Sequence, residues 1–412
     1  MKTLVIILSE TREYEKTFDL FKKNVLDELN ADLCLCIGVN PDYNYENPFY
    51  KIAKYKFLYD EPDDFADAFN YADSCFNKDL FEKLDNVNAI HSKLDFQKQT
   101  KNNIKYIQNK DMDKYINFNY ENENKLGDGG ELYSCVLNNL SNFNNSNIDN
   151  IDNIEEIVYH NIHFKKNNWK NQLYIVEKTN NLNNHNNLVE EQNVITYKRP
   201  INWREFLKVG DQFMGGIKDS KHQHPGSAGI LIFFRWFLLK NLTENNLITE
   251  YDRFVITRSD FIYQLPHPKL ELMNENFIWL PDSEYYGGYT DRHAVLSRYN
   301  IKQYLNILNC FILKSNEYYM KMKKFDQWNL EKVIKFHLEQ NKMGGMIKEF
   351  PYIMYSIRSS NGKTRWMAGV YNNSLGYYIK YPPEFEKSTY YKKLFERENL
   401  TIDNFYRKYF RC

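Results

Sequence analysis

The first forty residues constrain the fold more strongly than any other part of the chain. Thr3 to Leu8 and Leu33 to Val39 are apolar runs that indicate buried strands. Between them, apolar residues recur at helical spacing, namely Phe18, Phe21, Val25 and Leu29. A strand, a helix and a second strand in this order form a parallel βαβ unit. The sequence therefore predicts an α/β fold built on a mostly parallel sheet flanked by helices.

Polar residues follow each of these two predicted strands. In a parallel sheet, ligands bind beyond the carboxyl ends of the strands. Ser9 and Arg12 come directly after the first strand, and Gly38 and Asn40 come after the second. Arg12 at the start of a helix could bind a phosphate. A solvated arginine in the first helical turn is an equally good interpretation.

Composition narrows the class of protein. The 412 residues carry 54 basic and 54 acidic side chains, so no protein-wide attraction to nucleic acid is expected. The six cysteines include no CxxC pair, which indicates a reducing compartment and no structural zinc. The longest internal apolar run, Ala228 to Leu239, is interrupted by Arg235 and is shorter than the roughly 20 residues of a membrane span. We expect a soluble, cytoplasmic protein without a transmembrane segment.

An asparagine-rich stretch divides the chain. Residues 98–198 are dense in Asn, which is poor in helices and strands, so this stretch reads as an insertion. Residues 1–97 are then expected to be the N-terminal half of one domain, and residues 199–315 its second half. Residues 316–412 are predicted to be a mostly helical extension packed on the same domain.

A turn rich in glycine and serine precedes a long apolar run. Gly226 and Ser227 come just before Ile230 to Leu239, which is apolar almost all round and predicts a buried helix. Such a turn offers backbone N–H groups to an anion. It lacks the spacing of a Walker loop and of a GxGxxG turn, so no nucleotide motif identifies the ligand.

Charged residues follow a predicted buried strand in the middle of the chain. Arg253 to Thr257 is β-branched and aromatic, and it is followed by Arg258, Ser259 and Asp260. Buried charges need a partner, which can be a metal, a phosphate or each other. A structural Arg–Asp pair that closes the strand end is the alternative to a functional site.

A second polar segment follows the predicted strand Phe277 to Leu280. It contains Gly287 and Gly288, which let a backbone approach a ligand closely, and then a carboxylate, a cation and a titratable ring in Asp291, Arg292 and His293. These three residues are expected at the start of the next helix. Asp291 could accordingly serve only as the cap of that helix.

Taken in order, these motifs resemble the nucleotide-sugar glycosyltransferases of the GT-A fold, and most closely those of large DNA viruses (giant viruses), whose chains often carry Asn-rich tracts. The resemblance covers about 1–60 and 200–300. It implies a GT-A-like, Rossmann-type sheet in which 1–97 form the nucleotide-binding half and 199–315 form the half with the donor and acceptor motifs. It also implies transfer of a hexosyl or related group from a nucleotide-diphospho-sugar to a hydroxyl of a glycan or protein, in the host cytoplasm or viral factory.

The resemblance also assigns roles to the donor-side residues. In such enzymes a short acidic motif, usually Asp-x-Asp, holds a divalent cation against the donor diphosphate. Asp260 would be the ligand of Mn²⁺ or Mg²⁺, whereas Arg258 replaces the first Asp and would contact phosphate directly. The other expected donor-binding residues are Ser9, Arg12, Gly226 and Ser227.

The acceptor side is expected around the Gly-Gly segment. Asp291 would be the catalytic base, and Gly287, Gly288, Arg292 and His293 would line the acceptor. Glycosyl transfer places negative charge on the leaving phosphate, so cations are needed there, and inversion needs a carboxylate to deprotonate the acceptor hydroxyl.

Two alternatives remain open at this stage. The replaced first Asp favours a glycosyltransferase-like protein that has lost its chemistry and only binds a glycan or a partner. A sulfotransferase also combines a parallel sheet with arginines. Its phosphate loop would follow the first strand, where Ser9-Glu10-Thr11-Arg12 has no glycine and carries an acid.

Overall fold

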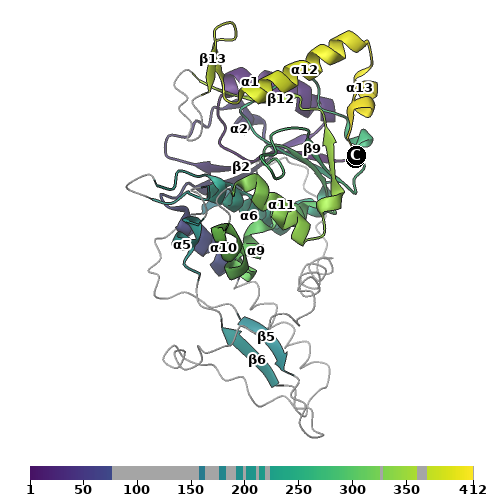
Figure 1. Ribbon diagram of the computed structural model, residues 1–412. Helices are drawn as coiled ribbons and strands as arrows, with labels where there is room; N and C mark the ends of the chain where they lie inside the picture. Colours follow the sequence, from purple (N-terminus) through teal and green to yellow (C-terminus); the bar gives the residue numbers. More distant parts are fainter. Residues whose placement is uncertain are drawn as a thin grey trace, which may run out of the picture. The chain divides into compact units, whose positions relative to one another are not determined.

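A computed structural model describes the chain in several ranges (Figure 1). They are residues 1–76, 157–162, 176–181, 192–197, 201–209, 213–218, 223–324, 328–359 and 369–411. One compact unit comprises Met1–Asn77 and Glu156–Cys412, and Lys78–Glu155 lie outside the described residues. Most of the Asn-rich segment predicted as an insertion therefore lies outside them too.

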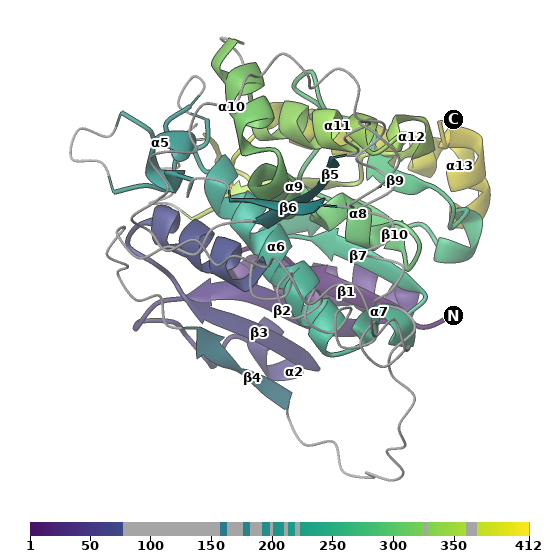
Figure 2. The same cartoon turned by 90° about the horizontal axis from the view of Figure 1, so that it is seen from below.

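The centre of the larger unit is an eight-stranded sheet in the order β11-β9-β10-β7-β1-β2-β3-β4 (Figure 2). The five neighbours from β4 to β7 are all parallel, β10 runs antiparallel to β7 and β9, and β11 is parallel to β9. The predicted α/β architecture with a mostly parallel sheet is confirmed. The strands are β1 (Thr3–Ile7), β2 (Asp32–Val39), β3 (Tyr55–Asp60), β4 (Ile157–Ile162), β7 (Arg253–Thr257), β9 (Ile278–Pro281), β10 (Ala294–Ser297) and β11 (Ile347–Phe350).

Helices cover both faces of this sheet because its strands are apolar on both sides. In β1, Leu4 and Ile6 face one core, and Val5 and Ile7 face the other. The first core contains α5 (Trp203–Leu207), α6 (Ala228–Glu244), α7 (Leu247–Glu250), α8 (Ile301–Leu305), α9 (Ile307–Leu313), α10 (Ser315–Lys324) and α11 (Leu330–Gln340). The second contains α1 (Tyr14–Phe21), the π-helical turn η1 (Lys22–Asp27), α2 (Pro48–Ile52), α12 (Pro382–Glu398) and α13 (Ile402–Tyr409).

Local sequence patterns mislead at two places. Phe49 to Tyr59 look helical in the sequence, but α2 ends at Ile52 and β3 begins at Tyr55. Aromatic residues favour a strand here, where β3 pairs with both β2 and β4. Likewise, no helix begins at Asp291, because the apolar run that follows pairs with β7 as β10.

The C-terminal region is less helical than predicted. It adds β11 to the main sheet and supplies most of a four-stranded sheet, β13-β14-β12-β8. Its strands are β8 (Phe261–Tyr263), β12 (Met354–Arg358), β13 (Val370–Asn372) and β14 (Tyr377–Ile379). Because β8 follows β7 directly, this second sheet brings residues beyond 350 to the carboxyl edge of the main sheet.

A third sheet has two strands. β5 (Val176–Asn181) and β6 (Gln192–Tyr197) pair as an antiparallel two-stranded ribbon. Over the described ranges, no helix combines the length and the apolar character needed to cross a bilayer.

A substitution of Arg253 tests the packing of β7. Its buried guanidinium donates to the carbonyl oxygens of Leu296 at 3.3 Å, Leu270 at 3.2 Å and Met273 at 2.7 Å. Arg253→Met would remove the buried donor that these three carbonyls share, so we expect the free energy of unfolding in urea to fall by about 1–3 kcal/mol.

The matched control is Arg298→Met, since Arg298 forms an exposed ion pair with Asp252. Its loss should be within about 1 kcal/mol. Equal losses for the two variants would contradict a structural role of the Arg253 hydrogen bonds.

Candidate functional site

The candidate site lies where the strand order reverses. From β1 the sheet continues to β2 and β3 on one side and to β7 on the other, with all four strands parallel. Ligands of open α/β sheets bind at such a switch point, beyond the carboxyl ends of the strands. The loop after β1 carries Ser9 and Arg12, and the loop after β7 carries Arg258 and Asp260. The structure thus brings these four predicted residues to the same edge.

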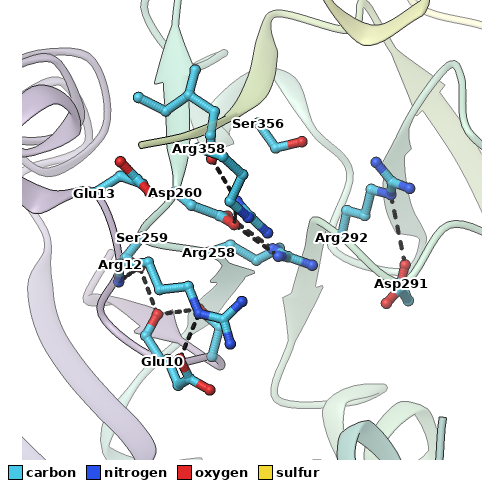
Figure 3. A network of polar contacts seen from close by, with 12 residues as sticks. Glu10, Arg12, Glu13, Arg258, Ser259, Asp260, Asp291, Arg292, Ser356 and Arg358 are labelled. Carbon is cyan, nitrogen blue, oxygen red and sulfur yellow. Dashed lines mark hydrogen bonds and ion pairs between the residues drawn. The ribbon is translucent and has the colours of Figure 1, made fainter. Parts of the chain in front are cut away.

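Ser259 joins the two loops (Figure 3). Its hydroxyl donates to the carbonyl oxygen of Glu10 at 2.7 Å and accepts from the backbone N–H of Arg12 at 3.0 Å. The Ser9 hydroxyl also donates to the Glu10 carbonyl, at 3.1 Å. The Arg12 side chain is half-exposed and pairs with the carboxylate of Glu10. The backbone of both loops is therefore fixed, while the guanidinium of Arg12 stays accessible.

Asp260 is held by two arginines. Arg258 donates from Nε to Oδ1 at 2.9 Å and from Nη2 to Oδ2 at 2.8 Å, and Nη1 of Arg358 also donates to Oδ2 (Figure 3). Asp260 is only 2% exposed. Burial acts to raise its pKa, but the charges of Arg258 and Arg358 hold the pKa of Asp260 well below its ordinary value.

These surroundings do not fit the Mn²⁺ or Mg²⁺ that the resemblance implies. Both oxygens of Asp260 already accept hydrogen bonds from guanidinium groups. Across the described residues, no group of three or more His, Cys, Asp or Glu side chains could hold a metal ion. Asp260 is therefore better described as one member of a structural Arg–Asp pair than as a metal ligand.

Two basic residues at this site escaped the sequence analysis. Arg358 ends β12, and Lys380 follows β14 and bonds through its backbone N–H to the Ser356 carbonyl at 2.9 Å. Burial and repulsion by Arg258 and Arg358 lower the pKa of Lys380 to about 6. No motif in the sequence places these strands beside β7, so only the fold reveals them. Arg258, Arg358 and Lys380 are called the cationic cluster below.

An acidic cluster adjoins the cationic one. It consists of Glu284, Asp291, Glu331 and Glu384, arranged around Arg292. Nη2 of Arg292 lies 3.5 Å from Glu284, Nε lies 3.9 Å from Asp291, and Nη1 pairs with Glu384. Burial and the negative charge of Asp291 raise the pKa of Glu331 to about 8. Figure 3 shows the Asp291–Arg292 pair to one side of Arg258 and Asp260.

The ring of Tyr381 links the two clusters. The guanidinium carbon of Arg292 lies 4.0 Å from the ring centroid, and Nζ of Lys380 lies 4.8 Å from it. The charge of Asp291 also reaches Arg258, whose pKa it helps to raise. The ring is therefore in contact with one cation from each side, the arginine at the centre of the acidic cluster and a lysine of the cationic cluster.

The predicted acceptor-side residues differ in whether they could contact a ligand. Asp291 lies in the acidic cluster, but Arg292 is buried and fully occupied by carboxylates. His293 is a core residue, contrary to prediction. Its Nε2 lies 3.2 Å from Nε2 of His267 and its Nδ1 lies 3.2 Å from the Thr257 hydroxyl. Burial, with the neighbouring His267, lowers the pKa of His293 well below its ordinary value, so the ring stays neutral.

The two glycines serve helix packing. A Cβ added at Gly288 would lie 1.9 Å from the carbonyl carbon of Glu331, in the first turn of α11. Gly287 has a φ of +83°, which favours glycine at that turn, and its added Cβ would meet the Lys332 side chain. The expected approach of a ligand to these residues is thus an approach of α11.

The turn before α6 is also occupied by the chain itself. The N–H groups of Ala228 and Gly229, which open the helix, donate to the carbonyls of Phe213 at 3.1 Å and Met214 at 2.8 Å. Gly226 packs against Gly215, where an added Cβ would lie 2.0 Å from the Gly226 carbonyl oxygen. Gly226 and Ser227 therefore begin a packed helix whose first amides are already bonded.

Gly288→Ala tests the packing on α11. The added methyl group must displace backbone, so we expect the free energy of unfolding in urea to fall by about 1–3 kcal/mol. Gly345→Ala is the control, because an added Cβ there meets no atom within 4 Å. A Gly288→Ala protein as stable as the control would contradict this packing.

Asp260→Asn tests the charge balance of the cationic cluster. At pH 7 the variant would leave Arg258 and Arg358 without their counter-charge, and we expect a loss of about 3–5 kcal/mol in the free energy of unfolding. The folded pKa of Asp260 is depressed, so its stabilisation is present above the unfolded value of about 3.9 and is lost as the pH falls toward the folded pKa.

The difference between wild type and Asp260→Asn should accordingly narrow below about pH 4 in denaturation curves. Asp27→Asn removes an exposed carboxylate paired with Lys22 and should cost less than about 1 kcal/mol. A difference for Asp260→Asn that is absent at pH 7, or constant down to acid pH, would disprove the ion-pair role.

Comparisons with known proteins provide no relative for this chain. No protein-family model matches it, and neither a curated protein nor a solved structure matches it significantly. Function is therefore inferred from the site itself.

Proposed function

We propose that this protein is a glycosyltransferase that moves a sugar from a nucleotide-diphospho-sugar to a hydroxyl of a glycan or protein. One observation carries the proposal. The cationic cluster and the acidic cluster adjoin each other across Tyr381, at the edge of the sheet where its strand order reverses. Ligand-binding crevices of open α/β sheets lie at this place.

The separation of charge suits the chemistry. When the bond between sugar and diphosphate breaks, negative charge grows on the leaving phosphate and positive charge on the sugar. Arg258, Arg358 and Lys380 can stabilise the phosphate, and the half-exposed Arg12 can contact the part of the donor nearest the solvent. The acidic cluster on the other side of Tyr381 can stabilise the sugar and activate the acceptor.

Asp291 is the proposed base. Its carboxylate lies 3.9 Å from Nε of Arg292, and its backbone carbonyl accepts from Nη2 of Arg235 at 3.3 Å, which positions the residue. With a pKa of about 8, Glu331 retains its proton near neutral pH and cannot take one from the acceptor. Asp291 is therefore the carboxylate of this pair that we propose to accept the proton of the acceptor hydroxyl.

The GT-A type of fold is part of this proposal. Its support is the βαβ start of the chain, the mostly parallel sheet, and the position of Arg258 and Asp260 directly after β7. A non-catalytic protein that binds a nucleotide-sugar or glycan is the second candidate. It is favoured by the engagement of both Asp260 oxygens with arginines, where the resemblance implies a metal.

A donor screen tests the proposal. Nucleotide-diphospho-sugars would be added to the purified protein with EDTA, Mn²⁺ or Mg²⁺, and binding measured by thermal shift and calorimetry. A ligand at a hundred times its Kd stabilises the fold by about 2.7 kcal/mol, which is readily detected. Release of nucleoside diphosphate with an acceptor would establish transfer. Binding without turnover would favour the second candidate, and binding of an adenosine-phosphosulfate donor alone would indicate a sulfotransferase.

Asp291→Asn separates chemistry from binding. We expect turnover to fall by about 10²–10⁴-fold, the usual contribution of a general base, while the calorimetric affinity for the donor is retained. Asp42→Asn is the control, since Asp42 is an exposed carboxylate in the loop after β2, on the same edge of the sheet. Wild-type turnover by the Asp291→Asn protein would remove Asp291 from the mechanism.

A further inference from the structure

We infer that this site binds a diphosphate without a metal ion, and that Arg358 and Lys380 from the C-terminal strands take the place of a divalent cation. The identification of this diphosphate as part of a nucleotide-sugar rests on the proposed function. The anion site itself depends on Arg358 and Lys380, to which the resemblance gives no role, together with Arg258.

Arg358 has hydrogen-bond donors that the described residues do not use. Its side chain is 4% exposed, and Nη1 donates to Asp260 and to the carbonyl of Ile357. Nε and Nη2 are buried, and among the described residues neither has a hydrogen-bond partner. Buried guanidinium donors are normally satisfied, and their planar fork matches two oxygens of a phosphate. The pair Nε and Nη2 therefore indicates an acceptor that comes from a ligand.

Lys380 provides a second, independent observation. It is 8% exposed, and the contact that its ammonium group makes among the described residues is with the ring of Tyr381, 4.8 Å from the centroid. The charged groups around it are Arg258, Arg358 and Arg292, with Asp260 as the only carboxylate among those that act on it most strongly. Such a lysine is unfavourable for the stability of the free protein, and an anion would relieve it.

The charges identify the class of ligand. Three cations, Arg258, Arg358 and Lys380, face the single carboxylate of Asp260, which leaves two positive charges unbalanced when Lys380 is protonated. The next carboxylate, Glu384, is already engaged by Arg292 and by the N–H and hydroxyl of Ser356 at 2.7 Å and 2.6 Å. An anion with two or more negative charges and several acceptor oxygens fits this arrangement, and a diphosphate has both.

A divalent cation fits poorly at the same place. It would face the three positive charges with no carboxylate oxygen left to bind it, and like charges repel strongly in a buried site. A bound diphosphate has the opposite effect. Its negative charge favours the protonated form of Lys380, whose pKa is lowered to about 6 in the free protein. The lysine is then charged where the ligand needs it.

Lys380→Met tests the inference with inorganic pyrophosphate as the probe. Titrations of the full-length protein would be followed by calorimetry in EDTA. We expect the wild type to bind without metal and Lys380→Met to bind at least about tenfold more weakly, because a charge-assisted contact is lost. The free variant should unfold close to the wild-type temperature, since the loss of the contact between Nζ and the Tyr381 ring is offset by relief of the repulsion from the arginines.

Two matched variants complete the experiment. Lys393→Met removes an exposed lysine of α12 and should bind like the wild type, and Lys380→Arg should retain most of the affinity. Wild-type binding that requires Mn²⁺ or Mg²⁺, or unchanged binding by Lys380→Met, would overturn the inference. Pyrophosphate binding that depends on Lys380, without turnover of any nucleotide-sugar, would refute the proposed function and leave the anion site standing.

Discussion

The carboxylate of Asp260 is the interaction on which the rest of the site depends. It joins Arg258, which extends from the main sheet, to Arg358, which ends a strand of the second sheet. Without this negative charge the two guanidinium groups would repel each other in a buried environment, and the second sheet would lose a link to the first. The residue that the family resemblance implies as a metal ligand thus organises cations. Its role in ligand binding is indirect, because it positions the arginines that face the anion.

The separation of charge has a wider meaning for the reaction. Positive groups gather around Asp260 and negative groups gather around Arg292, with the Tyr381 ring in contact with both. Asp260 lies among the cations and Arg292 among the acidic residues, and each reduces repulsion within the surrounding cluster without cancelling its charge. A preorganised arrangement of this kind can stabilise opposite charges on two parts of one substrate without rearranging during the reaction. Within the acidic cluster, burial and the charge of Asp291 raise the pKa of Glu331 to about 8, so Glu331 keeps its proton near neutral pH.

The sequence predicted the sheet and one half of the site. The βαβ pattern of the first forty residues and the run from Arg253 to Thr257 are local signals, and both were confirmed as strands of a parallel sheet. Local signals could not place Arg358, Lys380 or Glu331, because these residues reach the site only through the pairing of β12 with β8 and the packing of α11 on Gly288. Short motifs also led to predictions of ligand binding for residues that have structural roles. Gly288 and His293 resemble ligand-binding residues in sequence, yet helix packing and a buried histidine pair account for them.

The pairing of β1 with β7 has a consequence for how the protein is made. Leu4 lies opposite Phe254 in the sheet, a residue that stands 250 positions further along the chain. During synthesis the first three strands therefore leave the ribosome long before β7 is translated. The edge of β1 that pairs with β7 stays unpaired until then. The entropy of closing a loop grows only with the logarithm of its length, by about 0.6 kcal/mol for each doubling. The long segment between β3 and β4 thus adds little to the thermodynamic cost of assembly, whereas it delays the moment at which the two halves of the site can first meet.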